Sequence, residues 1–151
     1  MEKPADTTYP VHDLIRLRWS PRAFADRRVQ SDDLRSLLEA ARWAPSCYNE
    51  QPWSFLLATI DDHGAHERIL ACLTDRNRLW AQRAPVLMIS VATLTFSETG
   101  QPNRHAFHDV GLAVENLVIQ ATALGLVVHQ MAGMYPDMVQ AEFNLPPHHE
   151  A

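Results

Sequence analysis

The segment that decides the fold of this chain reads APSCYNEQPW and covers residues 44–53. Pro45 ends any helix before it, because proline lacks an amide hydrogen and disfavours a helical conformation at Ala44. The polar run Ser46–Pro52 therefore predicts a loop, and the apolar, aromatic run Trp53–Ile60 predicts a strand that ends at a turn. Hydroxyl and amide side chains on a loop stiffened by two prolines can bind a planar heteroaromatic ligand. Ordinary loop chemistry explains the same residues about equally well.

Working outward from this segment, the chain alternates helical and extended patterns. Apolar residues from Val11 predict a short helix that stops at Ser20 and Pro21. A second helix is expected from Ser31, whose hydroxyl is expected to cap it. Further helices are expected as one or two short ones within His66–Trp80, a long one from Phe107 to Leu124 capped by Gly125, and a last one from Pro136 to Phe143. Strands are expected at Val86–Val91, which is apolar on both faces and so typical of a central strand, and at Leu126–Met131.

The length and charge of the chain restrict its organisation and its partners. With 151 residues, no repeat and no linker, we expect one domain over residues 11–151, preceded by a flexible arm over residues 1–10. A formal net charge of −5 argues against nucleic acid as a partner. The longest apolar runs fall far short of the roughly 20 residues that cross a bilayer, and no signal peptide is recognisable, so we expect no membrane partner and a cytoplasmic location.

Several common catalytic motifs are absent from the sequence. Its five glycines form neither a dinucleotide-binding turn nor a phosphate loop, and neither a serine nucleophile elbow nor a zinc-protease histidine pair occurs. His148, His149 and Glu150 are expected to form a solvated tail, so we assign no metal. Cys47 and Cys72 are expected to be reduced thiols, and Cys47 a small packing or weakly hydrogen-bonding group rather than a redox centre. Three tryptophans are expected to anchor the core: Trp43, Trp53 and Trp80.

Another unusual segment, earlier in the chain, follows the first predicted helix. Residues 18–24 concentrate two guanidinium groups, Arg18 and Arg22, beside the hydroxyl of Ser20. Arginine binds phosphate oxygens bidentately, and a hydroxyl adds another donor. A solvated charged turn is the plain alternative.

Together the two segments resemble the signatures of the nitroreductase family of FMN-dependent oxidoreductases. The first signature is matched by Arg18, Trp19, Ser20, Arg22 and Phe24, and the second by Ala44, Pro45, Ser46, Asn49, Gln51, Pro52 and Trp53. Weaker matches follow at Asn77, Trp80, Ala84 and Pro85, at His108, Asp109, Gly111, Ala113, Asn116 and Leu117, and over Gly125–Gly133. The resemblance extends from about Val11 to Pro147. From the residues alone, His108 and Asp109 are interpreted as helix-end or interface side chains rather than catalytic ones.

The resemblance implies an α+β (α/β/α) fold, a mixed central β-sheet flanked by helices, in a homodimer with FMN at the subunit interface. One subunit would contribute Arg18, Trp19, Ser20 and Arg22, with Arg18 and Ser20 toward the phosphate and ribityl chain and Arg22 near the pyrimidine edge of the flavin. The other would contribute Pro45, Ser46, Cys47, Asn49 and Gln51. Asn77 would bond the pyrimidine, and Gln130, Met131, Ala132 and Gly133 would pass the flavin. A cation at the pyrimidine edge stabilises the negative charge that reduction places there.

The implied activity is hydride transfer from NADH or NADPH, through bound FMN, to an electron-poor small-molecule acceptor such as a nitroaromatic or quinone. No catalytic side chain is assigned, because the flavin performs the chemistry. The alternatives are a flavin-dependent dehydrogenase or dehalogenase of the same fold, and a non-catalytic flavin-binding protein. Family members usually continue beyond Pro147 with another strand, basic residues and an arm that embraces the partner. We therefore expect a shortened member with an uncovered sheet edge and weakly held FMN.

Overall fold

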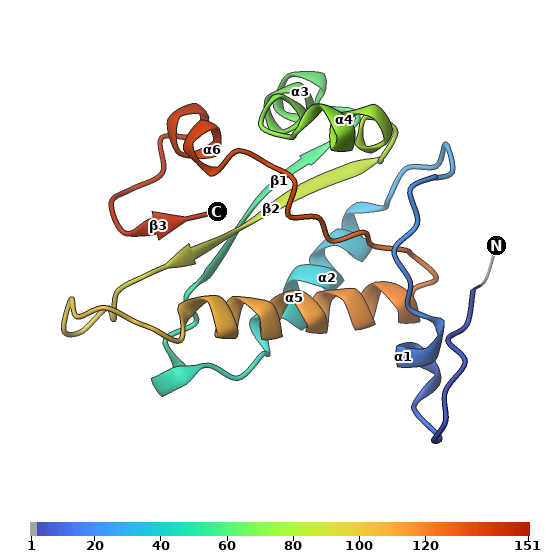
Figure 1. Cartoon of the computed structure of the whole chain (residues 1–151), viewed down its shortest axis with the longest axis horizontal. Helices are drawn as coiled ribbons and strands as arrows, with labels where there is room; N and C mark the ends of the chain where they lie inside the picture. Colours follow the sequence, from blue (N-terminus) through green and yellow to red (C-terminus); the bar gives the residue numbers. More distant parts are fainter. Residues whose placement is uncertain (1–2) are drawn as a thin grey trace.

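The computed structural model describes residues 3–151, and its elements follow the predicted order closely (Figure 1). The helices are α1 (Asp13–Leu17), α2 (Ser31–Arg42), a 3₁₀ turn η1 (Cys47–Asn49), α3 (His63–Ala71), α4 (Asp75–Ala81), α5 (Ala106–Ala123) and α6 (Pro136–Glu142). The strands are β1 (Trp53–Thr59), β2 (Val86–Thr93) and β3 (His149–Glu150). No helix within residues 3–151 is long and apolar enough to cross a membrane.

The sheet has the order β1-β2-β3, so β2 is central as its apolar character predicted. β1 pairs with β2 antiparallel from Trp53 opposite Ala92 to Thr59 opposite Val86. β3 pairs with β2 antiparallel only at Ala92 and Thr93. Both pairings are antiparallel, so the parallel part of the expected mixed sheet does not occur among residues 3–151.

Helices cover both faces of the sheet, and the alternation of side chains along β2 explains why. Met88 packs with the helices α2 and α5, whereas Leu87 and Ile89 pack with α3, α4 and α6 on the opposite face. Successive side chains of a strand point to opposite faces, so an uninterrupted apolar run fills two cores. The α+β class with an α/β/α layering is therefore confirmed.

The two ends of the chain were predicted to be a flexible arm and a solvated tail. Residues 3–10 of the predicted arm are exposed and contain neither helix nor strand, and the amide of Ala5 donates to the carbonyl of Arg16 at 2.8 Å; residues 1–2 lie outside the described part. The predicted solvated tail is wrong for the backbone of residues 148–150. The carbonyl of His148 accepts a hydrogen bond from Leu94, and His149 and Glu150 form β3, because the adjacent edge of β2 offers backbone partners.

The predicted strand Leu126–Met131 is also wrong, since this segment is irregular. A strand forms only where a neighbouring strand completes its hydrogen bonds. Residues Val86–Val91 of β2 pair with β1 alone, and a cavity of about 820 Å³ lies between β2 and the segment. Along Val86–Val91 one edge of β2 thus has no strand partner among residues 3–151.

The N-cap of α2 is Gln30, one residue before the predicted Ser31. The carbonyl of Gln30 already accepts a hydrogen bond from Leu34, so the helix begins at Ser31 and Gln30 is its N-cap. The hydroxyl of Ser31 therefore lies inside the first turn. Asp32 and Asp33 do occupy that turn as expected.

Candidate functional site

The first predicted loop, residues 18–24, follows α1 directly. Arg18 is the C-cap of α1, is half-buried, and donates from Nη1 to Oγ of Ser20 at 3.4 Å. Arg22 is exposed. In the described part of the chain neither guanidinium is paired with a carboxylate. Two unneutralised cations beside a hydroxyl are suited to an anionic ligand.

The second predicted loop, residues 45–51, has an unusual backbone. Tyr48, Asn49 and Gln51 adopt positive φ angles of 54°, 56° and 52°. The amide of Gln51 donates to Oγ of Ser46 at 2.9 Å, and Nε2 of Gln51 to Oδ1 of Asn49 at 3.5 Å. Left-handed conformations cost free energy in residues other than glycine and persist only where surrounding contacts enforce them. This loop is therefore specifically shaped.

Asp109 supplies one of those enforcing contacts, and the sequence analysis missed this role. Its side chain is only 3% exposed, and Oδ2 accepts a hydrogen bond from the amide of Cys47 at 3.0 Å. A buried carboxylate requires such donors. The signal in the sequence was an acidic residue in the first turn of an apolar helix, which also suits an ordinary helix end.

Asn77 and Gly133 are brought together, although in a different way from the one expected. Nδ2 of Asn77 donates to the carbonyl of Gly133 at 3.0 Å, and Oγ1 of Thr74 donates to the same oxygen at 3.1 Å. The amide of Thr74 is a third donor, at 3.0 Å. Asn77 therefore anchors the segment Gln130–Gly133 to α4. Its expected bond to a pyrimidine ring stays a prediction.

The predicted residues form two groups at opposite ends of α5 (Figure 1). Near the C-terminal end of α5, Trp19 and Pro21 line the large cavity together with Gln130 and Met131, and the same cavity extends along α5 as far as Phe107 in its first turn. The loop of residues 45–51 is held at the first turn of α5 through Asp109. The 18 residues of α5 span roughly 27 Å at about 1.5 Å per residue, so one chain does not bring the two loops together.

Trp43 does not anchor the core as expected. Its side chain is 74% exposed, and its indole nitrogen donates to Oε1 of Glu39 at 2.8 Å. This bond, followed by the contact with Arg42, lowers the pKa of the Glu39 carboxyl. Trp53 and Trp80 are partly buried against core clusters. Trp43 and the 90% exposed Tyr48 leave large aromatic surface uncovered near the second loop.

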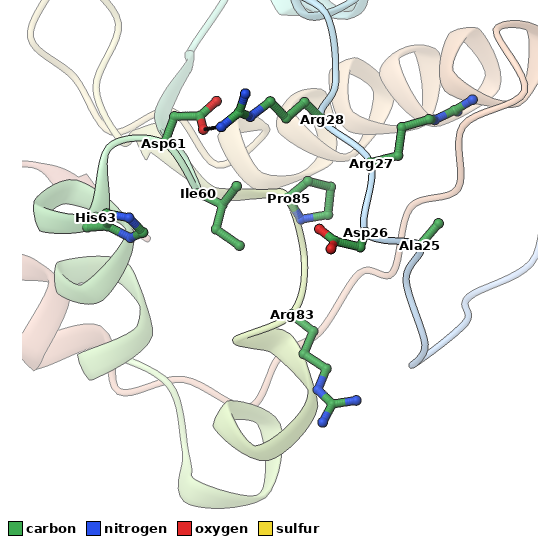
Figure 2. A pocket seen from close by; sticks show the side chains of 9 residues that line it. All are labelled: Ala25, Asp26, Arg27, Arg28, Ile60, Asp61, His63, Arg83 and Pro85. Atoms are coloured by element: carbon green, nitrogen blue, oxygen red, sulfur yellow. Dashed lines mark ion pairs between the residues drawn. The ribbon is translucent and has the colours of Figure 1, made fainter.

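A smaller cavity of about 240 Å³ is lined by residues 25–28, which directly follow the loop of residues 18–24 (Figure 2). Arg28 pairs there with Asp61 at 2.7 Å, whereas Arg27 and Arg83 point away from the cavity. The positive charges therefore do not converge on a ligand position. In the part of the chain described here, no group of three or more His, Cys, Asp or Glu side chains is arranged to hold a metal ion.

The structure is an α+β protein in which the two predicted loops are held near the two ends of its long central helix, by the Cys47–Asp109 bond and by a bond from His129 to the carbonyl of Pro21. Residues 15–151 match the family model described as the nitroreductase family, and the chain belongs to this family.

Proteins with similar sequences or structures support this family membership. A protein of Archaeoglobus fulgidus with the provisional name NADH dehydrogenase/NAD(P)H nitroreductase is 28% identical over 82% of this chain and 67% of its own length. The crystal structure of an oxidoreductase containing FMN matches with a TM-score of 0.90 and 34% identity, over 96% of this chain and 74% of that one. A provisionally named nitroreductase of Desulfovibrio desulfuricans, solved in complex with FMN, matches with a TM-score of 0.63 and 32% identity, over 78% of this chain and 65% of that one.

Proposed function

We propose that this protein is an FMN-dependent oxidoreductase that takes hydride from NADH or NADPH and reduces an electron-poor acceptor such as a nitroaromatic or quinone. The observation that carries the proposal is the loop Arg18–Arg22, whose two guanidinium groups lack carboxylate partners within residues 3–151, in a chain of the nitroreductase family. The names of relatives that contain FMN or use NAD(P)H support it.

The residues present fit the phosphate and the flavin ring of FMN. We assign Arg18 and Ser20 to the phosphate and ribityl chain, because a guanidinium and a hydroxyl are good donors to phosphate oxygens. We assign Arg22 to the pyrimidine edge, where a fixed cation stabilises the negative charge of the reduced ring. When bound, FMN would supply the hydride chemistry, while these residues bind and orient it.

We further propose that the active unit is a homodimer. A complete site requires both loops, and the length of α5 separates them within one chain. Pairing two copies would bring residues 45–51 of one chain to residues 18–22 of the other. Trp43, exposed just before the second loop, and Tyr48, exposed within it, provide the kind of aromatic surface that subunit contacts bury.

The experiment that tests the function is the visible spectrum of the purified chain with added FMN. We expect a yellow complex that loses its colour with NADPH or NADH under anaerobic conditions and regains it when a quinone or nitroaromatic is added. A complex that binds FMN and never bleaches would make the protein a flavin binder and contradict the enzyme assignment. Failure to bind FMN would contradict the cofactor assignment itself.

The contribution of Arg18 can be measured separately. A charged hydrogen bond contributes about 1.5–3 kcal/mol, so Arg18→Ala should weaken FMN binding about 10- to 150-fold in a fluorescence titration. Arg83→Ala is the matched control, because it removes the same charge from an exposed arginine that lines only the smaller cavity. Equal affinity of the two variants would place Arg18 on a solvated turn.

A further inference from the structure

The loop of residues 18–24 is attached to the rest of the protein by very few polar contacts. Among residues 3–151 no backbone–backbone hydrogen bond involves this loop. Arg18 bonds Ser20 within the loop itself. The one polar bond from the loop to another part of the described chain joins the carbonyl oxygen of Pro21 to Nδ1 of His129, at 2.8 Å.

This bond lies at the centre of the proposed phosphate-binding residues. Pro21 is buried, whereas its two neighbours, Ser20 and Arg22, are exposed. A carbonyl oxygen only accepts hydrogen bonds, so Nδ1 of His129 carries the hydrogen. The Pro21 carbonyl lies in the peptide plane that joins Pro21 to Arg22, so holding it orients that plane and the direction in which Arg22 projects. Proline fixes its own φ, so only ψ of Pro21 remains free between this plane and the preceding peptide of Ser20.

Aromatic packing holds the His129 ring in place. The ring centroid of His129 lies 4.4 Å from that of Trp80, and Trp80 stacks with Phe24 at 6.2 Å. Phe24 belongs to the same loop, so the aromatic row returns to the segment that His129 bonds. The imidazole therefore has a defined position from which to donate.

We propose that His129 is a positioning residue, which holds the Pro21 carbonyl and thereby presents Ser20 and Arg22 to the phosphate and ring of the flavin. It acts through its Nδ1 hydrogen bond rather than through its ring surface. This inference rests on the proposed function, because it takes FMN as the ligand of the loop.

Three substitutions separate the donor from the ring. His129→Asn places an amide donor near the position of Nδ1 and removes the ring, so it should keep FMN affinity within about twofold of the unaltered chain. His129→Phe keeps an aromatic ring without the donor, and His129→Gln carries its donor near the position of Nε2, out of reach of Pro21. Loss of a hydrogen bond should weaken FMN binding about 2- to 12-fold in both.

A double-mutant cycle gives a readout that a merely structural role would not change. If His129 acts through Ser20, the effect of His129→Phe should shrink in a Ser20→Ala background, because the hydroxyl that it orients is absent. Full additivity would overturn the proposal. Equal weakening of FMN binding by His129→Asn and His129→Phe would also overturn it, as would normal FMN affinity of His129→Phe and His129→Gln. Where His129→Phe does not fold, the comparison of His129→Asn with His129→Gln decides.

Limited digestion with trypsin tests the same contact without FMN. The full-length His129→Phe and His129→Gln chains should be cleaved faster after Arg22 than the unaltered and His129→Asn chains, with cleavage after Arg83 unchanged. Equal cleavage after Arg22 in all four would refute the positioning role. If the digestion follows the expected order and the unaltered chain still fails to bind FMN, the proposed function fails while the contact is real.

Discussion

Two side chains, Asp109 and His129, hold the two predicted cofactor loops near the two ends of α5. Each does so through a single hydrogen bond to loop backbone, at the Cys47 amide and at the Pro21 carbonyl. Polar groups that lose water on burial require such partners, and the loops gain fixed conformations in return. The residues that shape the site therefore include two that bind no ligand in our assignment.

The two cysteines should differ sharply in reactivity. Cys72 is 1% exposed, and burial, reinforced by Glu142, raises the pKa of its thiol, while Cys47 is half-buried. Thiolate is the reactive form, so a raised pKa keeps Cys72 protonated to higher pH. We expect an aromatic disulfide reagent to label Cys47 at least about tenfold faster at pH 8. Cys47→Ser should remove the fast phase, and faster labelling of Cys72 would contradict the argument.

Gly133 should tolerate no side chain. A Cβ built there would lie 2.3 Å from Nδ2 of Asn77, so Gly133→Ala must displace the amide that anchors the segment. We expect a loss of about 1–3 kcal/mol in the free energy of unfolding by urea. Gly111→Ala is the control, because a Cβ there meets nothing within 4 Å and a helical glycine is disfavoured by about 1 kcal/mol. A destabilised control would undermine the comparison.

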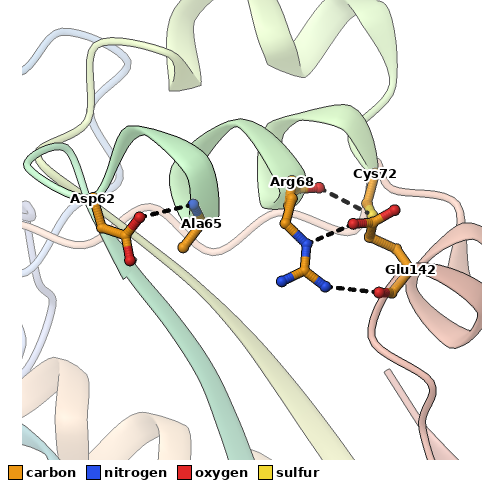
Figure 3. Close-up of polar contacts among 5 residues, drawn as sticks. All are labelled: Asp62, Ala65, Arg68, Cys72 and Glu142. Atoms are coloured by element: carbon orange, nitrogen blue, oxygen red, sulfur yellow. Dashed lines mark hydrogen bonds and ion pairs between the residues drawn. The ribbon is translucent and has the colours of Figure 1, made fainter.

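At the level of elements, α6 is joined to α3 by the side chain of Arg68 (Figure 3). Its Nε bonds the Glu142 carboxylate, and its Nη2 donates to the Glu142 carbonyl at 2.8 Å. The guanidinium also lies 4.7 Å from the ring centroid of Phe143. The sequence does not reveal this connection, because Arg68 and Glu142 are 74 positions apart.

Arg68→Ala should therefore loosen α6. The ion pair is nearly half exposed and contributes little, so we expect the hydrogen bonds and the ring contact to account for a loss of about 1 kcal/mol in unfolding free energy. Arg35→Ala removes an ion pair within α2 that is almost fully exposed, and should change stability by no more than about 0.5 kcal/mol. Equal losses of unfolding free energy in Arg68→Ala and Arg35→Ala, measured in urea, would show that Arg68 contributes no more than an exposed ion pair.

The helices and strands also show which sequence patterns predict secondary structure. The helices α2 and α5 and the strands β1 and β2 were predicted within a few residues, because apolar periodicity and prolines act locally. Leu126–Met131 has a strand-like composition and is irregular, because pairing depends on a neighbour elsewhere in the chain. Secondary structure was thus predictable where a single segment decides it.

At the level of the whole molecule, the separated loops lead to a test of the proposed homodimer. Mixing Arg18→Ala chains with Asn49→Ala chains should restore one intact site in each heterodimer, since both defects then fall in the other site. With random exchange about a quarter of all sites should recover normal FMN affinity. Each variant alone should lack normal sites, and a site formed within one chain would show no recovery after mixing.

The sequence alone determined the order of the main helices and strands and the two motif segments, because these depend on neighbouring residues and short spacings. The fold class followed from the family resemblance that the motif segments carry. Tertiary structure alone decided that Trp43 is exposed, that Asp109 and His129 hold loops, and that the two loops lie at opposite ends of α5. The bonded pairs are 62 and 108 positions apart. Contacts over such separations leave no local pattern, because only the folded chain brings the partners together.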